Sequence, residues 1–225
     1  MPQTGRQPAG VHGAVWTIVV AAGVGVRFGT RKQYELLGSR RVLDWALDSA
    51  RAVSDGIVLA VPVERAGEPE PAADVVVAGG ESRSASVRAG LAATPDDAEV
   101  IVVHDAARPL APEWLFENVV AAVRAGADGV VPALPIADTV KRVRGGEVEA
   151  TLDRSELVTV QTPQAFRADV LRKAHAGGDE ASDDAALVEA VAGRVVVVVG
   201  DPLNAKVTSP HDLERAREHV GRLGL

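Results

Sequence analysis

A short apolar stretch that leads into glycines and cations is the part of this sequence best suited to chemistry. Residues 17–22 read TIVVAA, which is typical of a buried strand. Glycines allow a backbone to approach an anion and to turn its N–H groups toward it, while Arg and Lys supply positive charge. A strand followed by such a loop therefore favours binding of a polyphosphate. The glycines and cations concerned are Gly23, Gly25, Gly29, Arg27, Arg31 and Lys32.

Two well-known phosphate-binding motifs are absent from this stretch. Its glycines do not fit G-x-G-x-x-G, because position 28 is Phe28, and no G-x-x-x-x-G-K-[ST] occurs. Taken alone, the stretch is explained as well by an ordinary strand-to-helix turn with solvated surface cations. The nucleotide hypothesis therefore depends on the rest of the chain.

The composition restricts the classes of protein to consider. With 225 residues, of which 47% are hydrophobic, the chain can bury a substantial core as one domain. A formal net charge of −7 argues against a general nucleic-acid binder, although an acidic protein can still hold a small basic pocket for phosphates. The absence of cysteine excludes disulfides, thiolate catalysis and Cys-zinc sites, and the five histidines show no metal-binding spacing.

The N-terminal region has some features of a targeting segment. We expect residues 1–13, rich in Pro, Gly and Gln, to form a flexible tail, and residues 14–225 to form a single domain. The apolar run 14–22 follows Arg6, as in a secretory signal, but cleavage there would remove the first strand and open the glycine loop. No apolar run approaches the ~20 residues that span a bilayer. We therefore expect a soluble, cytoplasmic protein with no membrane partner.

Apolar strands alternate with amphipathic helices along most of the chain. This order predicts an α/β fold with a mainly parallel sheet covered by helices on both faces. In such sheets ligands bind beyond the carboxyl ends of the strands. The glycine loop, Gly79-Gly80 and His104-Asp105 each follow a strand, so we expect these turns to meet at one edge. Strands are expected at 57–61, 74–78, 100–103, 130–133 and 195–200, the last of them central, and helices at 42–53, 83–93, 112–125, 168–175 and 183–191.

The pattern changes between residues 136 and 159, which we expect to form an arm. Residues 139–143 and 148–152 are short segments of period two around Gly145-Gly146, which is typical of a β-hairpin. The arm has too little apolar content for a core of its own, so it must lie on the domain or on another subunit, and a homodimer is the simplest expectation. Further along, 161–164 reads as a loop, Ser182 as a helix cap, and Ser209-Pro210 as the start of the last helix.

Eight motifs between residue 21 and about residue 212 point to a known family. Together they closely resemble the 2-C-methyl-D-erythritol 4-phosphate cytidylyltransferases of the non-mevalonate isoprenoid pathway, and they occur in the order that this family has them. The chain departs from the family at Arg31, where Pro is usual, and its glycine loop is shorter than in many members. The motifs are AAGVGVRFG with KQY (21–34), GGESRSASV (79–87), VHDAARPL (103–110), ADTVKRV (137–143), LDR (152–154), QTPQAF (161–166), SDDAALVE (182–189) and NAKVTSP (204–210).

The resemblance implies a Rossmann-like nucleotidyltransferase fold and a homodimer joined through the hairpin arm. The implied reaction combines CTP and 2-C-methyl-D-erythritol 4-phosphate, with Mg²⁺, to give 4-diphosphocytidyl-2-C-methyl-D-erythritol and pyrophosphate. The phosphate monoester attacks the α-phosphorus directly, without a covalent enzyme intermediate. Such chemistry needs positioning and charge neutralisation more than a protein nucleophile. The sequence agrees, because cations surround the glycine loop and no Ser-His-Asp or Cys-His set is apparent.

The resemblance also assigns roles to residues that match the family motifs. Four cations would be catalytic: Arg27 and Lys32 at the phosphates of CTP, Lys206 at the attacking phosphate, and Arg154 from the partner's arm. Contacts to the nucleotide would come from Ala21, Ala22, Gly23, Gly25, Gly80, Arg83, Ser86 and Ala106. Contacts to the second substrate would come from Asp105, Arg108, Thr162 and, from the partner's arm, Thr139. Asp105 is also the candidate ligand for the metal, and His104 is expected to be structural.

Two alternative functions stay open. A cytidylyltransferase of the same fold that acts on ribitol 5-phosphate needs the same cations and polar contacts, so physical reasoning barely separates it from the first interpretation. A non-catalytic nucleotide-binding protein on this scaffold predicts an incomplete set of cations. All four catalytic candidates are present, which favours an enzyme.

Overall fold

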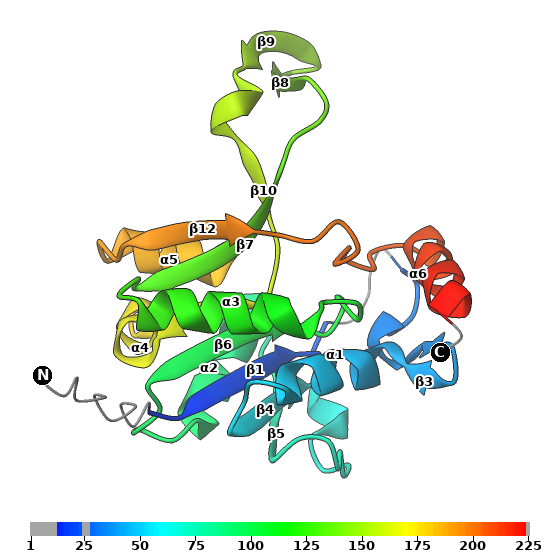
Figure 1. Ribbon diagram of the computed structural model, residues 1–225, viewed down its shortest axis with the longest axis vertical. Coiled ribbons are helices and arrows are strands. Elements are labelled where there is room, and N and C mark those ends of the chain that lie inside the picture. Colours follow the sequence, from blue (N-terminus) through cyan, green and yellow to red (C-terminus); the bar gives the residue numbers. More distant parts are fainter. Residues whose placement is uncertain (1–12, 24–27, 224–225) are drawn as a thin grey trace, which may run out of the picture.

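A mixed, mainly parallel sheet flanked by helices forms the body of the protein, and a hairpin projects from it (Figure 1). The computed structural model describes residues 13–23 and 28–223. The α/β fold class expected from the alternating pattern is confirmed. The main sheet consists of β1 (Val15–Val20), β4 (Gly56–Val61), β5 (Val75–Ala78), β6 (Val100–Asp105), β7 (Gly129–Pro135), β10 (Val158–Val160), β11 (Gln164–Arg167) and β12 (Val195–Val199).

The strand order is β10-β7-β11-β6-β1-β4-β5, and β12 pairs with β7 on its other side. Strands β1, β4, β5 and β6 are parallel to one another, whereas β11 runs antiparallel to both β6 and β7. Strand β1 thus lies in the interior of the sheet, between β4 and β6. The carboxyl ends of β1, β4 and β6 consequently lie at one edge.

Helices cover both faces of the sheet, because alternate strand residues point to opposite sides. Val15 and Val19 pack with α1 (Val42–Arg51) and α3 (Glu113–Arg124), which lie in front of the sheet in Figure 1. Ile18 points the other way and packs with α2 (Arg83–Ala93), α4 (Ala168–His175) and α5 (Asp184–Ala190). These two clusters form the core on either side of the sheet.

A third, smaller cluster joins the C-terminal helix to the segment after the glycine loop. Helix α6 (Pro210–Leu223) buries Leu213 and Val220 against Leu37 and Val42. This segment contains the 3₁₀ turn η1 (Lys32–Tyr34) and a small ribbon of β2 (Leu36–Leu37) and β3 (Arg40–Arg41). A second 3₁₀ turn, η2 (Val63–Arg65), follows β4. Packing of α6 therefore helps to place Lys32 at the edge of the sheet.

The expected hairpin is present as β8 (Val140–Arg144) and β9 (Glu147–Leu152), which pair antiparallel and form no part of the main sheet. Gly145 and Gly146 occupy the turn with φ of +59° and +87°, a conformation that glycine adopts without steric cost. The 3₁₀ turn η3 (Arg154–Glu156) leads back to the body. Nearly all of β8 and β9 is exposed, and Figure 1 shows them well away from the sheet.

Several sequence-based expectations need correction. Strand β12 is an edge strand and not a central one, because antiparallel β11 lies between β6 and β7 and leaves only the outer side of β7 free; Val197 and Val199 of β12 are exposed. The sequence pattern predicts no strand at β10 or β11: β10 overlaps the end of the arm expected at 136–159, and β11 begins at the end of the loop expected at 161–164. The cap of α5 is Asp183 and not Ser182, since the Asp183 carboxylate accepts a hydrogen bond from the Ala186 N–H. Pro112 precedes the first turn of α3 instead of lying in it.

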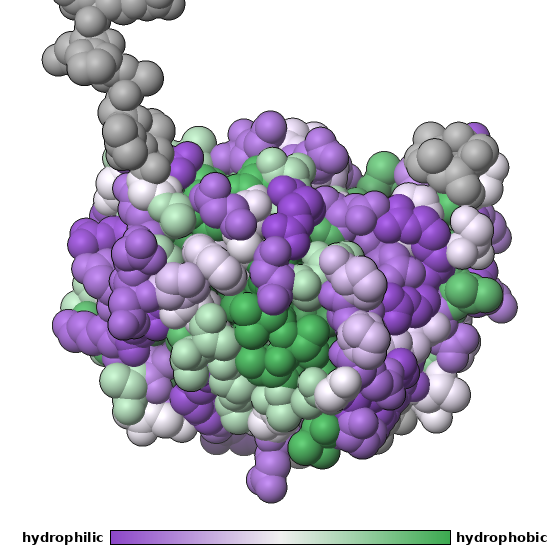
Figure 2. Space-filling view, turned by 90° about the horizontal axis from the view of Figure 1, so that it is seen from below, coloured by the Kyte–Doolittle hydropathy of each residue, from purple (hydrophilic) through white to green (hydrophobic). Residues whose placement is uncertain are grey.

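The surface opposite the arm exposes apolar side chains framed by polar ones (Figure 2). Strand β5 forms the edge of the sheet away from the arm, and its valines at 75–77 are half-buried. Within residues 13–23 and 28–223, none of the helices has the length and apolar character needed to cross a membrane.

Candidate active site

Two adjoining cavities lie at the carboxyl edge of the sheet. The first has a volume of about 370 Å³ and is lined by the ends of β1 and β6, the start of α2, and Lys32. The second has a volume of about 270 Å³ and is lined by the residues around Arg108, Thr162 and Asp183. Arg83, Asp105 and Lys206 line both cavities. The three turns that the sequence places at strand ends therefore meet in one site.

On one side of the first cavity, the loop after β1 is held by a buried glutamine. The Gln33 side chain donates hydrogen bonds to the carbonyls of Ala21 at 2.6 Å and Gly23 at 3.0 Å. Both carbonyls are thereby turned toward Gln33. The nucleotide-contact candidates Ala21, Ala22 and Gly23 line the cavity beside Lys32. Gly25 and Arg27, two further candidates, lie outside the described residues.

The start of α2 forms another part of the wall of the first cavity. A Cβ on Gly79 would stand 2.2 Å from the Cβ of Ala22, so the close approach of the two loops requires glycine there. Ser82 caps the helix by accepting a hydrogen bond from the Ala85 N–H. The buried Ser86 hydroxyl accepts from the Gly80 N–H at 3.2 Å and donates to the Ser82 carbonyl at 2.9 Å. Ser86 thus shapes the loop as well as lining the cavity.

Asp105 lies at the border of the two cavities between two cations. Its Oδ1 accepts a hydrogen bond from Arg83 Nε at 3.1 Å, and its Oδ2 accepts one from Lys206 Nζ at 2.5 Å. Burial raises the pKa of Asp105, but the positive charges of Arg83 and Lys206 outweigh burial and hold the pKa well below its ordinary value. The carboxylate therefore stays ionised and fixes the positions of both cations.

A buried hydrogen-bond chain supports the second cavity. The Asp105 N–H donates to Thr162 Oγ1 at 3.0 Å, so the Thr162 hydroxyl can direct its hydrogen to His104 Nδ1 at 3.3 Å. His104 Nε2 then carries the ring hydrogen and donates to the Arg108 carbonyl at 3.2 Å. Burial lowers the pKa of His104 to about 4, so the ring is neutral near pH 7. His104 is buried, hydrogen-bonded and absent from the lining of both cavities, as expected for a structural support.

The loop that carries Lys206 is tied to the rest of the site by two buried amides. Gln161 donates to the Asp201 carbonyl at 2.8 Å and accepts from the Asp201 N–H at 3.1 Å. The side-chain amide of Asn204 donates to the Thr162 backbone carbonyl at 2.8 Å. The backbone carbonyl of Asn204 accepts a hydrogen bond from Arg108 Nη1 at 2.7 Å. These contacts hold Arg108, Thr162 and Lys206 together around the second cavity.

Sequence reasoning gave no role to Gln33, Gln161 or Asn204, although each lies within a family-like motif. Their positions in the sequence could have indicated a supporting role. Gln33 and Gln161 adjoin the candidates Lys32 and Thr162, and Asn204 is two residues before Lys206. Arg31, where the family usually has Pro, lines neither cavity and pairs with Glu64.

The two arm residues are placed differently from the others. Thr139 and Arg154 are both exposed, and neither lines a cavity. The Arg154 guanidinium donates to the carbonyl of Ala137 within the arm. Of the candidates in the described part of the chain, only these two are not brought to the edge of the sheet by their own chain. The assembled candidates are Ala21, Ala22, Gly23, Lys32, Gly80, Arg83, Ser86, Asp105, Ala106, Arg108, Thr162 and Lys206.

The side chains offer little to a metal ion on their own. Within residues 13–23 and 28–223, no group of three or more His, Cys, Asp or Glu side chains could hold one. The carboxylates that line the first cavity are Glu81 and Asp105. Mg²⁺ is commonly held by one or two carboxylates together with substrate phosphates, which is the only mode that suits this donor set.

Comparisons with known proteins agree on one family. Residues 15–222 match the family model described as 2-C-methyl-D-erythritol 4-phosphate cytidylyltransferase. The enzymes of that name from Rhodococcus opacus and Nocardia farcinica are each 47% identical to this chain, over 93% of it and over 96% and 95% of their own lengths. The crystal structure of the enzyme of that name from Thermus thermophilus is 33% identical, with a TM-score of 0.79 over 91% of this chain and 98% of that one.

Proposed function

Because the chain belongs to the 2-C-methyl-D-erythritol 4-phosphate cytidylyltransferase family, we propose that it transfers CMP from CTP to 2-C-methyl-D-erythritol 4-phosphate. An oxygen of the acceptor phosphate forms a bond to the α-phosphorus of CTP, the bond from this phosphorus to the bridging oxygen breaks, and pyrophosphate leaves. The products are 4-diphosphocytidyl-2-C-methyl-D-erythritol and pyrophosphate, in isoprenoid precursor synthesis. The observation that carries the proposal is the cluster of Arg83, Asp105 and Lys206, shared by two adjoining cavities.

CTP is assigned to the first cavity. Small residues at 21–23 and the glycines before α2 leave room for a nucleoside, and the N-terminus of α2 favours negative charge. Lys32 also lines this cavity, and Arg27 lies between residue 23 and Lys32 in the sequence. In a site that excludes water, such cations can stabilise the departing pyrophosphate by several kcal/mol.

The acceptor is assigned to the second cavity. Arg108 and Thr162 line it and offer contacts to a polyol phosphate, and Lys206 stands where the two cavities join. Its ammonium group is 2.5 Å from Asp105, which restricts its movement. Lys206 then holds the acceptor phosphate next to the α-phosphorus. The protein thereby lowers the barrier by positioning the two substrates and neutralising their charges.

Mg²⁺ would be carried mainly by the triphosphate, with the ionised carboxylate of Asp105 as its protein ligand. Both Asp105 oxygens already accept hydrogen bonds from Arg83 and Lys206, so Asp105 can supply one ligand at most and the phosphates must supply others. When bound, the metal neutralises negative charge on the phosphates.

A homodimer would complete the site through the arm. Thr139 and Arg154 are exposed on one chain and line neither of its cavities, as expected for residues that serve a second chain. The arm that carries them projects from the body (Figure 1). The arm also exposes Val143 and Val148, which a partner can cover. We further propose that the protein acts in the cytoplasm, which is supported by the interior place of β1: the apolar run that resembles a secretory signal is a structural strand.

The direct test is an assay of the purified protein with CTP, Mg²⁺ and either 2-C-methyl-D-erythritol 4-phosphate or ribitol 5-phosphate. We expect pyrophosphate release with the first acceptor and little with the second, while UTP in place of CTP serves as the matched control for the nucleotide. Turnover of ribitol 5-phosphate alone would make the protein a ribitol-phosphate cytidylyltransferase. Binding of CTP without turnover of either acceptor would make it a non-catalytic nucleotide-binding protein.

A further inference from the structure

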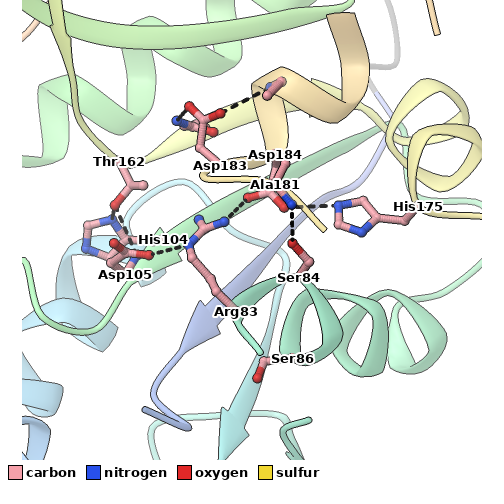
Figure 3. Close-up of polar contacts among 12 residues, drawn as sticks. Arg83, Ser84, Ser86, His104, Asp105, Thr162, His175, Ala181, Asp183 and Asp184 are labelled. Atoms are coloured by element: carbon pink, nitrogen blue, oxygen red, sulfur yellow. Dashed lines mark hydrogen bonds and ion pairs between the residues drawn. The ribbon is translucent and has the colours of Figure 1, made fainter. Parts of the chain in front are cut away.

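A series of hydrogen bonds links His175 and Asp184 to Arg83, which lines both cavities (Figure 3). His175, at the end of α4, contacts Asp184 Oδ1 through Nε2 at 3.0 Å. Asp184 Oδ2 in turn accepts a hydrogen bond from Arg83 Nη1 at 2.7 Å. Because a carboxylate oxygen only accepts, His175 Nε2 must carry a hydrogen. Three helices, α2, α4 and α5, are joined by these two contacts.

Arg83 stands at the border of the cavities with its orientation set by two carboxylates. Asp184 holds Nη1, and Asp105 holds Nε at 3.1 Å. The charges of Asp105 and Asp184 outweigh the effect of burial and raise the pKa of Arg83 above its ordinary value. The third nitrogen, Nη2, is buried and has no hydrogen-bond partner among the described residues. The Arg83 side chain as a whole is 22% exposed and lines both cavities, so its positive charge lies beside any phosphate bound there.

Asp184 is the member of this hydrogen-bonded series that the sequence did not indicate. Its side chain is 0% exposed, and it lines neither cavity. Placing a carboxylate in the interior is costly unless it is paired and hydrogen-bonded, and Asp184 has both partners. Its place in the first turn of α5 is favourable for a negative charge. The contacts of Asp184 account for its own burial, and they leave Arg83 little freedom to turn.

We propose that Asp184, held in turn by His175, is a positioning residue that fixes the Arg83 guanidinium at the border of the two cavities. This role rests on the proposed cytidylyl transfer, in which both substrates carry phosphates that meet at that border. Without Asp184, Arg83 would turn toward Asp105, its other anionic neighbour. Asp105 would then bind Lys206 less firmly. Asp184 therefore acts on the reaction through Arg83, without touching either substrate.

The test is the Asp184→Asn variant, in which the side chain keeps its size but loses its negative charge. We expect kcat to fall by roughly 10- to 100-fold, because small displacements of a positioned group have effects of this size. The KM values for CTP and for the acceptor should change by no more than about threefold, since the remaining contacts of each cavity persist. Large changes in KM with kcat unaltered would overturn the proposal.

A double-mutant cycle separates positioning from general stability. In an Arg83→Lys protein the geometry set by Asp184 is already lost, so adding Asp184→Asn should lower kcat by no more than about twofold. Two variants that act independently would instead multiply their losses, and that result would overturn the proposal. The cycle requires a measurable wild-type activity. Absence of turnover in the wild type would therefore reject the proposed function, which is a different outcome.

Arg172→Gln is the matched control. Arg172 is in α4, like His175, and donates to the carbonyls of Leu91, Thr94 and Pro95 near the far end of α2. Its replacement should lower the melting temperature but leave kcat unchanged. A fall in kcat like that of Asp184→Asn would show that loosening these helices is enough, against the proposal.

A second pair of variants keeps the test informative if Asp184→Asn fails to fold. His175→Gln preserves an N–H donor near the position of Nε2, whereas His175→Leu removes it and keeps an apolar bulk. We expect His175→Leu to lower kcat severalfold and His175→Gln to restore most of it. Equal kcat values for the two variants and the wild type would overturn the proposed role of His175 and Asp184 in positioning Arg83.

Discussion

The edge of the sheet and the projecting arm hold their charged side chains in different ways. At the edge, Asp105 is nearly buried and is fixed by Arg83 and Lys206, each at hydrogen-bond distance. In the arm, Thr139 and Arg154 are exposed, and the contact of Arg154 is to a backbone carbonyl of the arm itself. One chain therefore positions the cations at the edge by itself, whereas the arm residues would be placed by a second chain in the proposed homodimer.

The sharpest test of the edge is Lys206→Ala. This change removes a cation shared by both cavities and leaves Asp105 with Arg83 alone. We expect kcat/KM for the acceptor to fall by about 10²- to 10³-fold, the range seen when one preorganised group that stabilises charge is lost. The dissociation constant of CTP, measured by calorimetry, should rise by less than about tenfold. Lys173→Ala, at an exposed cation of α4, is the control; equal losses for CTP and acceptor would contradict the role of Lys206.

The arm is tested by mixing chains. A heterodimer of one Arg154→Ala chain and one Lys32→Ala chain keeps one site whose body and arm are both intact. It should show about half of the wild-type activity, while each homodimeric variant is nearly inactive. The measurement is turnover by heterodimers isolated through two different affinity tags.

A heterodimer of Lys32→Ala and Lys206→Ala chains is the matched control. Both residues line the first cavity of one chain, so neither body is intact and no activity should return. Recovery in this control, or none in the Arg154 mixture, would mean that the site is not shared between arm and body as proposed.

Protonation of His104 at acidic pH should lower the free energy of unfolding of the protein. The folded protein lowers the pKa of His104 from 6.5 to about 4, so the unfolded chain binds the proton more readily between these values. Stability is therefore present above pH 6.5 and is lost as the pH falls toward 4, by about 3 kcal/mol. The check is urea unfolding of the wild type and His104→Gln from pH 7 to 4. Groups other than His104 contribute equally to both, so identical pH slopes would contradict the prediction.

The smallest expected effect concerns the apolar surface of the arm. Val148 is exposed in one chain, and its replacement by Lys should raise the dimer dissociation constant at least about tenfold, because a covered valine contributes about 1.5 kcal/mol or more. Analytical ultracentrifugation measures this constant. Val63→Lys, at an exposed valine of η2 in the body, should leave it unchanged. Equal dimer dissociation constants for the two variants would show that the arm is not part of the dimer interface.

Local patterns were enough for the elements that depend on near neighbours in the sequence. The predicted bounds of α2 and α4 coincide with the observed ones, since apolar spacing and helix-starting residues are local signals. The hairpin follows from Gly145 and Gly146 for the same reason. The final helix begins as expected, with the Asp212 N–H donating to Ser209 Oγ at 3.3 Å.

Long-range packing decided what the patterns left open. The all-valine run of β12 reads as a central strand, yet it lies at the edge because β11 occupies the place between β6 and β7. Local composition favours the opposite arrangement, since β11 reads QAFR and β12 reads VVVVV. The choice depends on which partner strands remain free. Likewise, the sequence places Asp184 only in the first turn of the helix expected at 183–191. Only the approach of Arg83, 101 residues away in the sequence, makes it a buried partner of the site.

By itself, the sequence determined the family, the α/β fold and which turns carry the residues proposed to bind the phosphates and the acceptor, because these follow from motifs and from apolar periodicity. Only the tertiary structure decided that Arg83, Asp105 and Lys206 form one cluster between two cavities, and that Gln33, Gln161 and Asn204 hold the loops around them. The physical reason is that a charge cluster exists only once distant segments bring opposite charges into contact and exclude water from between them.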